Sequence, residues 1–87
     1  MSRVRLYGFD ECPFCDDLKK MYEENGIFYS YIDINDDKNE EEVKKIMELG
    51  KSESVPIILV NKTILSPDNS FNSIKEAYLL TNRFLSQ

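Results

Sequence analysis

The sequence contains no histidine and no tryptophan, and it has only two cysteines, three glycines and three prolines. Without histidine, the chain has no imidazole that could serve as a catalytic base, a metal ligand or a pH switch. No apolar run approaches the roughly 20 residues that a membrane-spanning helix needs. At the N-terminus, Arg3 and Arg5 interrupt the sequence before a signal-like apolar region develops. We therefore expect a cytoplasmic protein that does not enter a membrane.

Length and charge narrow the class of protein further. The 87 residues leave room for one domain, which we expect to span 1–87 and to be a monomer. A formal net charge of −5 disfavours binding to nucleic acid, which attracts basic patches. The two cysteines are separated by only two residues, a loop too small to form the disulfide framework of a small secreted domain.

Four segments are expected to form strands. Val4 to Phe9 alternates apolar and polar residues, and residues 28–34 are rich in aromatic and β-branched side chains. Residues 57–60 form a continuous apolar run, which is typical of a central buried strand. A tight turn then leads into residues 63–65 as the hairpin partner.

Three helices are expected between and after these strands. Pro13 suits the first position of the first helix, since it has no N–H to leave unpaired. Residues 36–39 open the second helix, and the third follows the loop 66–70. We expect the third helix to turn four residues inward: Phe71, Ile74, Tyr78 and Leu85. The resulting order, β-α-β-α-β-β-α, predicts an α/β fold in which helices cover both faces of a mixed four-stranded sheet.

The cysteine pair, Cys12 and Cys15, lies at the predicted start of the first helix, directly after a strand. The thiolate is the nucleophile in thiol–disulfide exchange, and the free N–H groups at a helix start stabilise its negative charge. Cys15 lies about one helical turn further on, where it can resolve a mixed disulfide formed on Cys12. We therefore predict that Cys12, exposed at the helix start, attacks and that Cys15 is the less accessible resolving thiol. Redox exchange is the chemistry that this arrangement favours.

Two other interpretations of the pair remain open. Two cysteines are half of a structural zinc site, but such a site needs four ligands and the chain has no histidine to complete it. Zinc would then require a dimer or carboxylate ligands, and we expect no metal. Alternatively, the cysteines are an incidental buried pair without chemistry.

Three motifs resemble those of the glutaredoxin family, and the resemblance extends over nearly the whole chain. The segment Cys12-Pro13-Phe14-Cys15 is similar to the family's Cys-Pro-Tyr-Cys. Tyr7 matches a tyrosine that is common five residues before the first cysteine. Ser54-Val55-Pro56 resembles the family's Thr-Val-Pro, whose proline is cis and lies against the cysteines.

This resemblance implies a thioredoxin-like fold and disulfide reduction with glutathione as the reducing co-substrate, without a bound cofactor. It also implies that Val55 pairs its backbone with a substrate cysteine. Further contacts to glutathione or substrate are expected from Tyr7, Pro13, Phe14, Pro56, Asp68, Asn69 and Ser70.

Several of these residues also have a purely structural interpretation. Tyr7 is equally well explained as a strand residue that packs on a helix, and Phe14 as an exposed rim residue that shields the disulfide. Val55-Pro56 could be an ordinary trans entry into a strand. Asp68, Asn69 and Ser70 could hold the γ-glutamyl end of glutathione, or they could only cap the last helix.

The sequence also departs from the family pattern near the cysteines. Phe9 occupies the position where the family usually has a lysine close to the glycine carboxylate of glutathione. Four acids flank the cysteines: Asp10, Glu11, Asp16 and Asp17. Like charges oppose both a thiolate and an anionic tripeptide. We therefore expect glutathione to bind more weakly than in a lysine-bearing relative.

The sequence thus favours a dithiol oxidoreductase that reduces protein disulfides and mixed disulfides. Disulfide-bearing proteins are the expected partners, and a ribonucleotide reductase is typical of the family. The first alternative is a thioredoxin-like electron carrier that a flavoprotein reductase reduces. The second is a redox-sensing or binding module that keeps the fold without turnover.

Overall fold

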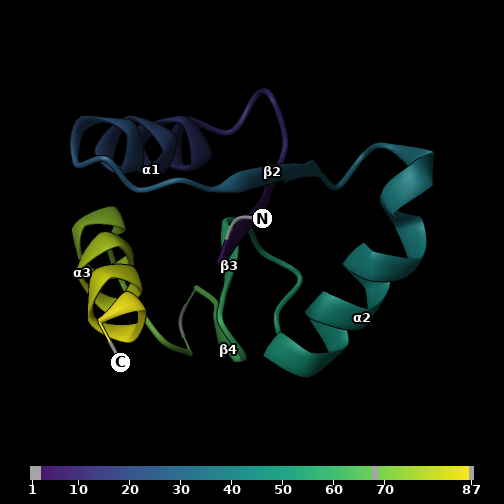
Figure 1. The fold of residues 1–87 in the computed structure, drawn as a ribbon. Helices are drawn as coiled ribbons and strands as arrows, with labels where there is room; N and C mark the ends of the chain where they lie inside the picture. The colour runs from purple at the N-terminus through teal and green to yellow at the C-terminus, as the bar shows by residue number, and fades with distance from the viewer. Residues whose placement is uncertain (1–2, 68, 87) are drawn as a thin grey trace.

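The computed structural model of the protein describes residues 3–67 and 69–86, and its elements follow the predicted order (Figure 1). None of the described helices is long and apolar enough to cross a membrane. The elements are β1 (Val4–Gly8), α1 (Pro13–Glu24), β2 (Ser30–Asp33), a 3₁₀ turn (Asp37–Asn39), α2 (Glu40–Gly50), β3 (Ile57–Val60), β4 (Thr63–Leu65) and α3 (Ile74–Leu85).

The four strands form the mixed sheet that the sequence predicted, and their order in it is β2-β1-β3-β4. β1 pairs with β2 in parallel and with β3 antiparallel, and β4 completes a hairpin with β3. In this register Leu6 of β1 stands between Tyr31 of β2 and Ile58 of β3. The predicted central position of the apolar strand β3 is confirmed.

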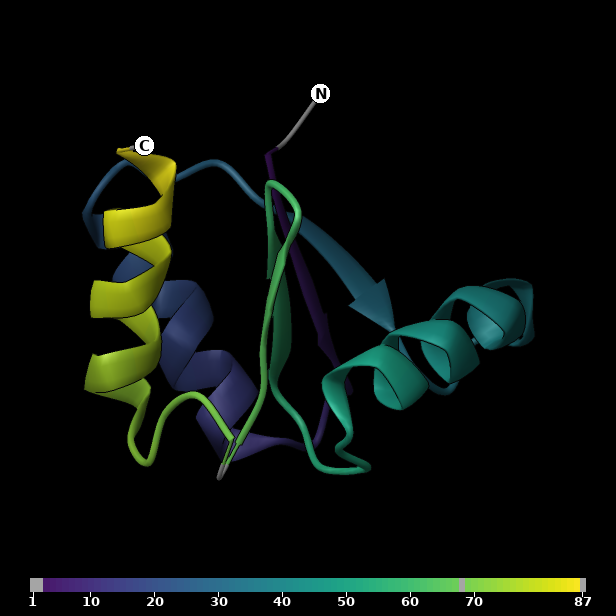
Figure 2. The same cartoon turned by 90° about the horizontal axis from the view of Figure 1, so that it is seen from below.

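The helices divide between the two faces of the sheet, which Figure 2 shows almost edge-on. Helices α1 and α3 cover one face, and α2 lies alone on the other. A hydroxyl pair joins α1 and α3, since Tyr22 and Thr81 hydrogen-bond at 2.7 Å in the buried layer. The core beneath α1 and α3 contains Val4, Leu6, Leu18, Tyr22, Ile58, Val60, Leu65, Phe71 and Ala77. The core beneath α2 contains Tyr7, Ile32, Val43, Ile46 and Ile57.

Several boundaries differ from the sequence-based expectation: β1 ends at Gly8 instead of Phe9, β2 ends at Asp33 instead of Ile34, and a 3₁₀ turn precedes α2. β2 begins at Ser30 and not at Phe28, because Ser30 already pairs with Arg5 and β1 offers no partner two residues earlier. Phe28 is consequently 86% exposed. Phe71 reaches the core, as predicted, but from the loop before α3, whose first helical residue is Ile74.

Candidate active site

Cys12 is the N-cap of α1, with extended backbone angles (φ −99°, ψ 107°) and Pro13 at the first helical position. The Cys15 backbone N–H donates to the Cys12 sulfur at a donor–acceptor distance of 3.3 Å. A helix start with such N–H donors, and with the positive end of the helix dipole, favours a sulfur that carries negative charge. The local sequence explains this geometry, since proline fixes the helical φ angle directly after the cap.

The two sulfurs are free thiols whose Sγ atoms lie 2.7 Å apart, with Cys15 donating to Cys12. Cys12 is only 4% exposed and Cys15 is fully buried. The prediction of an exposed Cys12 is therefore wrong, because the residue is buried at the helix start, where its backbone N–H donates to the Phe9 carbonyl at 3.2 Å. The expected order of accessibility is confirmed.

Burial is the main reason that Cys15 retains its proton. Together with the hydrogen bond to Cys12, burial raises the pKa of the Cys15 thiol to about 12, against opposing effects of the Phe9 backbone and of Lys19. A thiol that donates a hydrogen bond to its neighbour stabilises the neighbour's anionic form. The geometry thus assigns the two sulfurs different chemistry, with Cys12 as the acceptor and Cys15 as the donor.

Gly8 makes room for the buried sulfur. A Cβ placed on Gly8 would lie 2.6 Å from Cys15 Sγ and 3.2 Å from Cys15 Cβ. This role of Gly8 was not predicted from the sequence, although a glycine inside a strand often marks a close approach of another group.

A groove lies beside the cysteines. The Val55–Pro56 peptide bond is cis, as the resemblance implied, and Pro56 is buried while Val55 is half-buried. Phe14, which is 61% exposed, lines a groove of about 340 Å³ together with Val55 and Pro56. The remaining lining residues are Ser54, Pro67, Phe71, Asn72, Ser73 and Ile74. The residues after Pro67 were missed as groove residues because they join the site only through the fold of the chain.

Comparison with known proteins decides the family of this site. The family model described as Glutaredoxin matches residues 4–65, which include both cysteines and the cis-proline segment. The chain belongs to the glutaredoxin family. A comparison with curated individual proteins found no match.

Solved glutaredoxin structures share the fold at low sequence identity. The glutaredoxin of Archaeoglobus fulgidus has a TM-score of 0.72 at 18% identity, over 100% of this chain and 89% of that one. A wheat glutaredoxin has a TM-score of 0.70 at 18% identity, over 94% of this chain and 71% of that one. A mutated buckwheat glutaredoxin has a TM-score of 0.73 at 11% identity, over 98% of this chain and 78% of that one. These likenesses confirm the thioredoxin-like fold.

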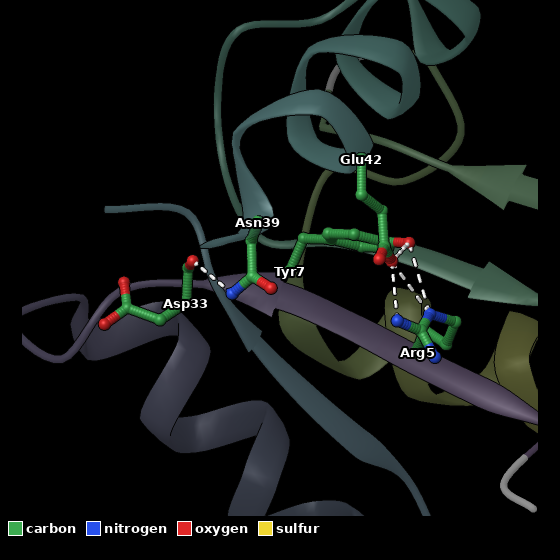
Figure 3. Close-up of polar contacts among 5 residues, drawn as sticks. All are labelled: Arg5, Tyr7, Asp33, Asn39 and Glu42. Carbon is green, nitrogen blue, oxygen red and sulfur yellow. Dashed lines mark hydrogen bonds and ion pairs between the residues drawn. The ribbon is translucent and has the colours of Figure 1, made fainter. Parts of the chain in front are cut away.

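This glutaredoxin-family chain uses Tyr7 as a packing residue. Tyr7 is 1% exposed, belongs to the core beneath α2, and donates its hydroxyl proton to Glu42 (Figure 3). Arg5 completes the cluster with an ion pair to Glu42 at 2.7 Å. Successive strand residues face opposite sides of a sheet, so Tyr7 points away from the face on which Gly8 meets Cys15. This placement supports the interpretation of Tyr7 as a strand residue that packs on a helix.

In the segment after β4, Asn69 and Ser70 make hydrogen bonds within the fold. Asn69 donates from its side-chain amide to the carbonyls of Gly50 and Lys51, at 3.2 and 3.1 Å, and so closes the end of α2. Ser70 Oγ accepts from the Ser66 N–H at 3.3 Å. Asp68 lies outside the described residues.

Capping of the last helix, one of the two interpretations of this segment, is wrong for Asn69 and Ser70. The N-cap of α3 is Ser73, whose hydroxyl accepts from the Glu76 N–H at 3.2 Å. Glu76 in turn accepts from the Asn72 N–H at 2.8 Å. The Ser-x-x-Glu spacing is a known sign of a helix start, and it could have located this boundary from the sequence.

The charges at the site match the sequence-based expectation. Asp10, Glu11, Asp16 and Asp17 are all exposed around the helix start. Within the described ranges, no group of three or more cysteine, aspartate and glutamate side chains is close enough together to hold a metal ion.

Proposed function

We propose that this glutaredoxin-family thiol–disulfide oxidoreductase reduces protein disulfides and glutathione mixed disulfides through Cys12 and Cys15, with glutathione as the final reductant. One observation carries the proposal: Cys12 accepts hydrogen bonds from the Cys15 N–H and thiol at the start of α1. This arrangement stabilises one thiolate and keeps a second thiol in contact with it, as dithiol exchange requires.

The proposed reaction has two exchange steps. The Cys12 thiolate attacks a substrate disulfide, whose S–S bond breaks, and the departing substrate sulfur takes up a proton. Cys15 then loses its proton and attacks the Cys12 sulfur, which releases the second substrate thiol and leaves the protein disulfide. Two glutathione molecules restore the dithiol and are themselves oxidised to glutathione disulfide. With a glutathione mixed disulfide as substrate, Cys12 suffices.

The groove beside the cysteines is the proposed binding site for the substrate backbone. Val55 would pair with an extended segment of the substrate, in the manner of an added strand. Phe14, which is exposed, would offer apolar surface to the residues that flank the substrate cysteine. The acids around the helix start favour a disulfide with basic neighbours. A ribonucleotide reductase is one candidate partner.

A second candidate function follows from the charge at the site. Phe9 and four exposed acids provide no cation for the carboxylates of glutathione, and Asn69 is occupied by the end of α2. These observations favour a carrier that receives electrons from a flavoprotein reductase. A redox-sensing module without turnover is the third candidate. For all three we propose a monomer in a reducing compartment such as the cytoplasm, where thiols remain reduced.

One coupled assay separates the three functions. The protein is mixed with glutathione, glutathione reductase, NADPH and a small glutathione mixed disulfide, and NADPH consumption is followed. Turnover that disappears in Cys12→Ser supports the proposal. Turnover only with a thioredoxin reductase in place of glutathione supports the carrier, and turnover with neither supports the sensing module.

A further inference from the structure

The inner side of Cys15 faces Tyr31 of β2. Tyr31 pairs with Leu6 in the parallel register and therefore lies on the sheet face that α1 and α3 cover. A Cβ on Gly8 would lie 3.5 Å from Tyr31 Cε1 and 2.6 Å from Cys15 Sγ. Gly8 thus brings the tyrosine ring and the resolving sulfur close together.

Lys19 completes this side of the site. It lies four residues after Cys15, and residues with this spacing share one face of a helix. Its Nζ atom is 3.6 Å from the centroid of the Tyr31 ring, a geometry that holds a cation by its attraction to the ring face. Asp16 Oδ1 lies 3.8 Å from the same nitrogen, and the Lys19 side chain is 23% exposed. The ammonium group is therefore held against the sheet and not free in solvent.

The burial of the Tyr31 hydroxyl is an independent observation. Among the residues that the structure describes, it is buried and has no hydrogen-bond partner. Buried polar groups without partners are rare, and each calls for an explanation. Burial and the nearby charge of Cys15 raise the pKa of Tyr31, so the hydroxyl keeps its proton and can only gain from a new acceptor.

We propose that Lys19 and Tyr31 are positioning residues that stabilise the Cys15 thiolate during the resolving step, Lys19 by its charge and Tyr31 by a hydrogen bond. The inference rests on the proposed function of Cys15. In the resolving step Cys15 releases its proton to solvent and forms a new bond to the Cys12 sulfur. The bond between Cys12 and the substrate breaks, and its electron pair leaves on the substrate sulfur, which is thereby reduced.

The contacts of Cys15 explain why this stabilisation is confined to the resolving step. In the free dithiol, the hydrogen bond to Cys12 helps to retain the Cys15 proton. Once Cys12 is bonded to substrate, its sulfur carries no charge and this restraint is removed. The titratable groups around Cys15 and the Tyr31 hydroxyl are Cys12, Asp16 and Lys19 of α1, Asp10 of the preceding turn, and Asp33 of β2. Lys19 is the one cation in this set.

The test uses a chromogenic aromatic disulfide and stopped-flow absorbance across a range of pH. The first released thiolate reports attack by Cys12, at a rate proportional to reagent concentration. The second reports resolution by Cys15, at a rate independent of that concentration. In Lys19→Gln we expect the midpoint of the second phase to move about one pH unit higher, with about tenfold slower resolution at pH 7. Lys19→Arg should restore the profile, and Tyr31→Phe should give a smaller shift in the same direction.

Lys20→Gln is the matched control, because it removes the same charge from an exposed neighbour. We expect both of its phases to equal those of the parent protein. An unchanged midpoint in Lys19→Gln, or an equal shift in Lys20→Gln, would overturn the role of Lys19. An unchanged profile in Tyr31→Phe would overturn that of Tyr31. If the parent protein lacks the first phase altogether, the proposed function fails instead.

Discussion

Gly8→Ala is expected to destabilise the protein through a single contact. Nothing in the backbone of Gly8 requires glycine, because its φ angle is not among the positive ones. Elsewhere such a replacement stabilises by about 0.4–1 kcal/mol through the unfolded chain. Here the new methyl group would lie 2.6 Å from Cys15 Sγ, inside a fully buried site. Overpacking of this kind costs about 1–3 kcal/mol, so we expect a net loss of about 1–2 kcal/mol.

Thermal unfolding measures this loss. For a domain of this size, 1 kcal/mol corresponds to about 4–8 °C in Tm, so Gly8→Ala should lower Tm by roughly 5–15 °C. The same displacement of Cys15 Sγ should slow the resolving step. Gly26→Ala is the control, because it introduces backbone strain without a steric contact: Gly26 has φ +69° and open space around it. We expect it to lower Tm without changing the exchange kinetics.

A double-mutant cycle isolates the contact. Cys15→Ala removes the sulfur that the new methyl group would meet, so Gly8→Ala should cost less than about 0.5 kcal/mol in that background. If Gly8→Ala costs the same with and without the Cys15 sulfur, the steric explanation is refuted.

Four further predictions address the site and its surroundings. Cys12→Ser should abolish all exchange, whereas Cys15→Ser should retain reactions with glutathione mixed disulfides and lose protein-disulfide reduction; equal losses in both assays would contradict the assigned roles. Phe9→Lys should lower the apparent KM for glutathione about tenfold at low salt, which corresponds to 1.4 kcal/mol, and the gain should shrink as salt screens the charge. Asn69→Ala should lower the free energy of unfolding by about 1 kcal/mol in urea titrations while the KM for glutathione stays unchanged; a raised KM would show that Asn69 binds the ligand. Burial raises the pKa of Tyr22 from 10.0 to about 12. Its contribution to the free energy of unfolding is therefore full below pH 10 and is lost as the pH rises through 12. In Tyr22→Phe, this loss of stability at alkaline pH should be smaller.

The fold could be predicted from the sequence because its cues are local. The continuous apolar run of β3 indicated a central strand, and Pro13 after a cysteine indicated a helix start; the structure confirms both. The errors came from pairing and capping. Phe28 is aromatic, and aromatic residues are common in strands, but β1 is too short to pair with it. Ser73 is the cap of α3, although the loop before it contains asparagine and serine residues that suit a cap equally well.

The site could be predicted only as far as its motifs extend. The cysteine pair follows from residue spacing, and the cis-proline segment follows from the resemblance to the glutaredoxin family. The strand residues near Cys15 could not be predicted, because their position depends on sheet register. Gly8 and Tyr31 lie 7 and 16 positions away from Cys15 in the sequence. Tyr7 shows the converse, since a motif match placed it at the site while strand alternation turns it to the opposite face.

Sheet register also explains why the two cysteines need different surroundings. Cys12 depends on backbone N–H groups of its own helix start, which any helix in this position would provide. Cys15 is fully buried, and burial alone would keep its thiol protonated and unreactive. On our proposal, groups outside the motif make this thiol reactive: Tyr31 of β2, which lies beside Gly8, and Lys19 of α1, whose ammonium group lies over the Tyr31 ring. It follows that variation at Pro13 and Phe14, between the cysteines, should act mainly on the first exchange step, whereas variation at Tyr31 and Lys19 should act mainly on the second.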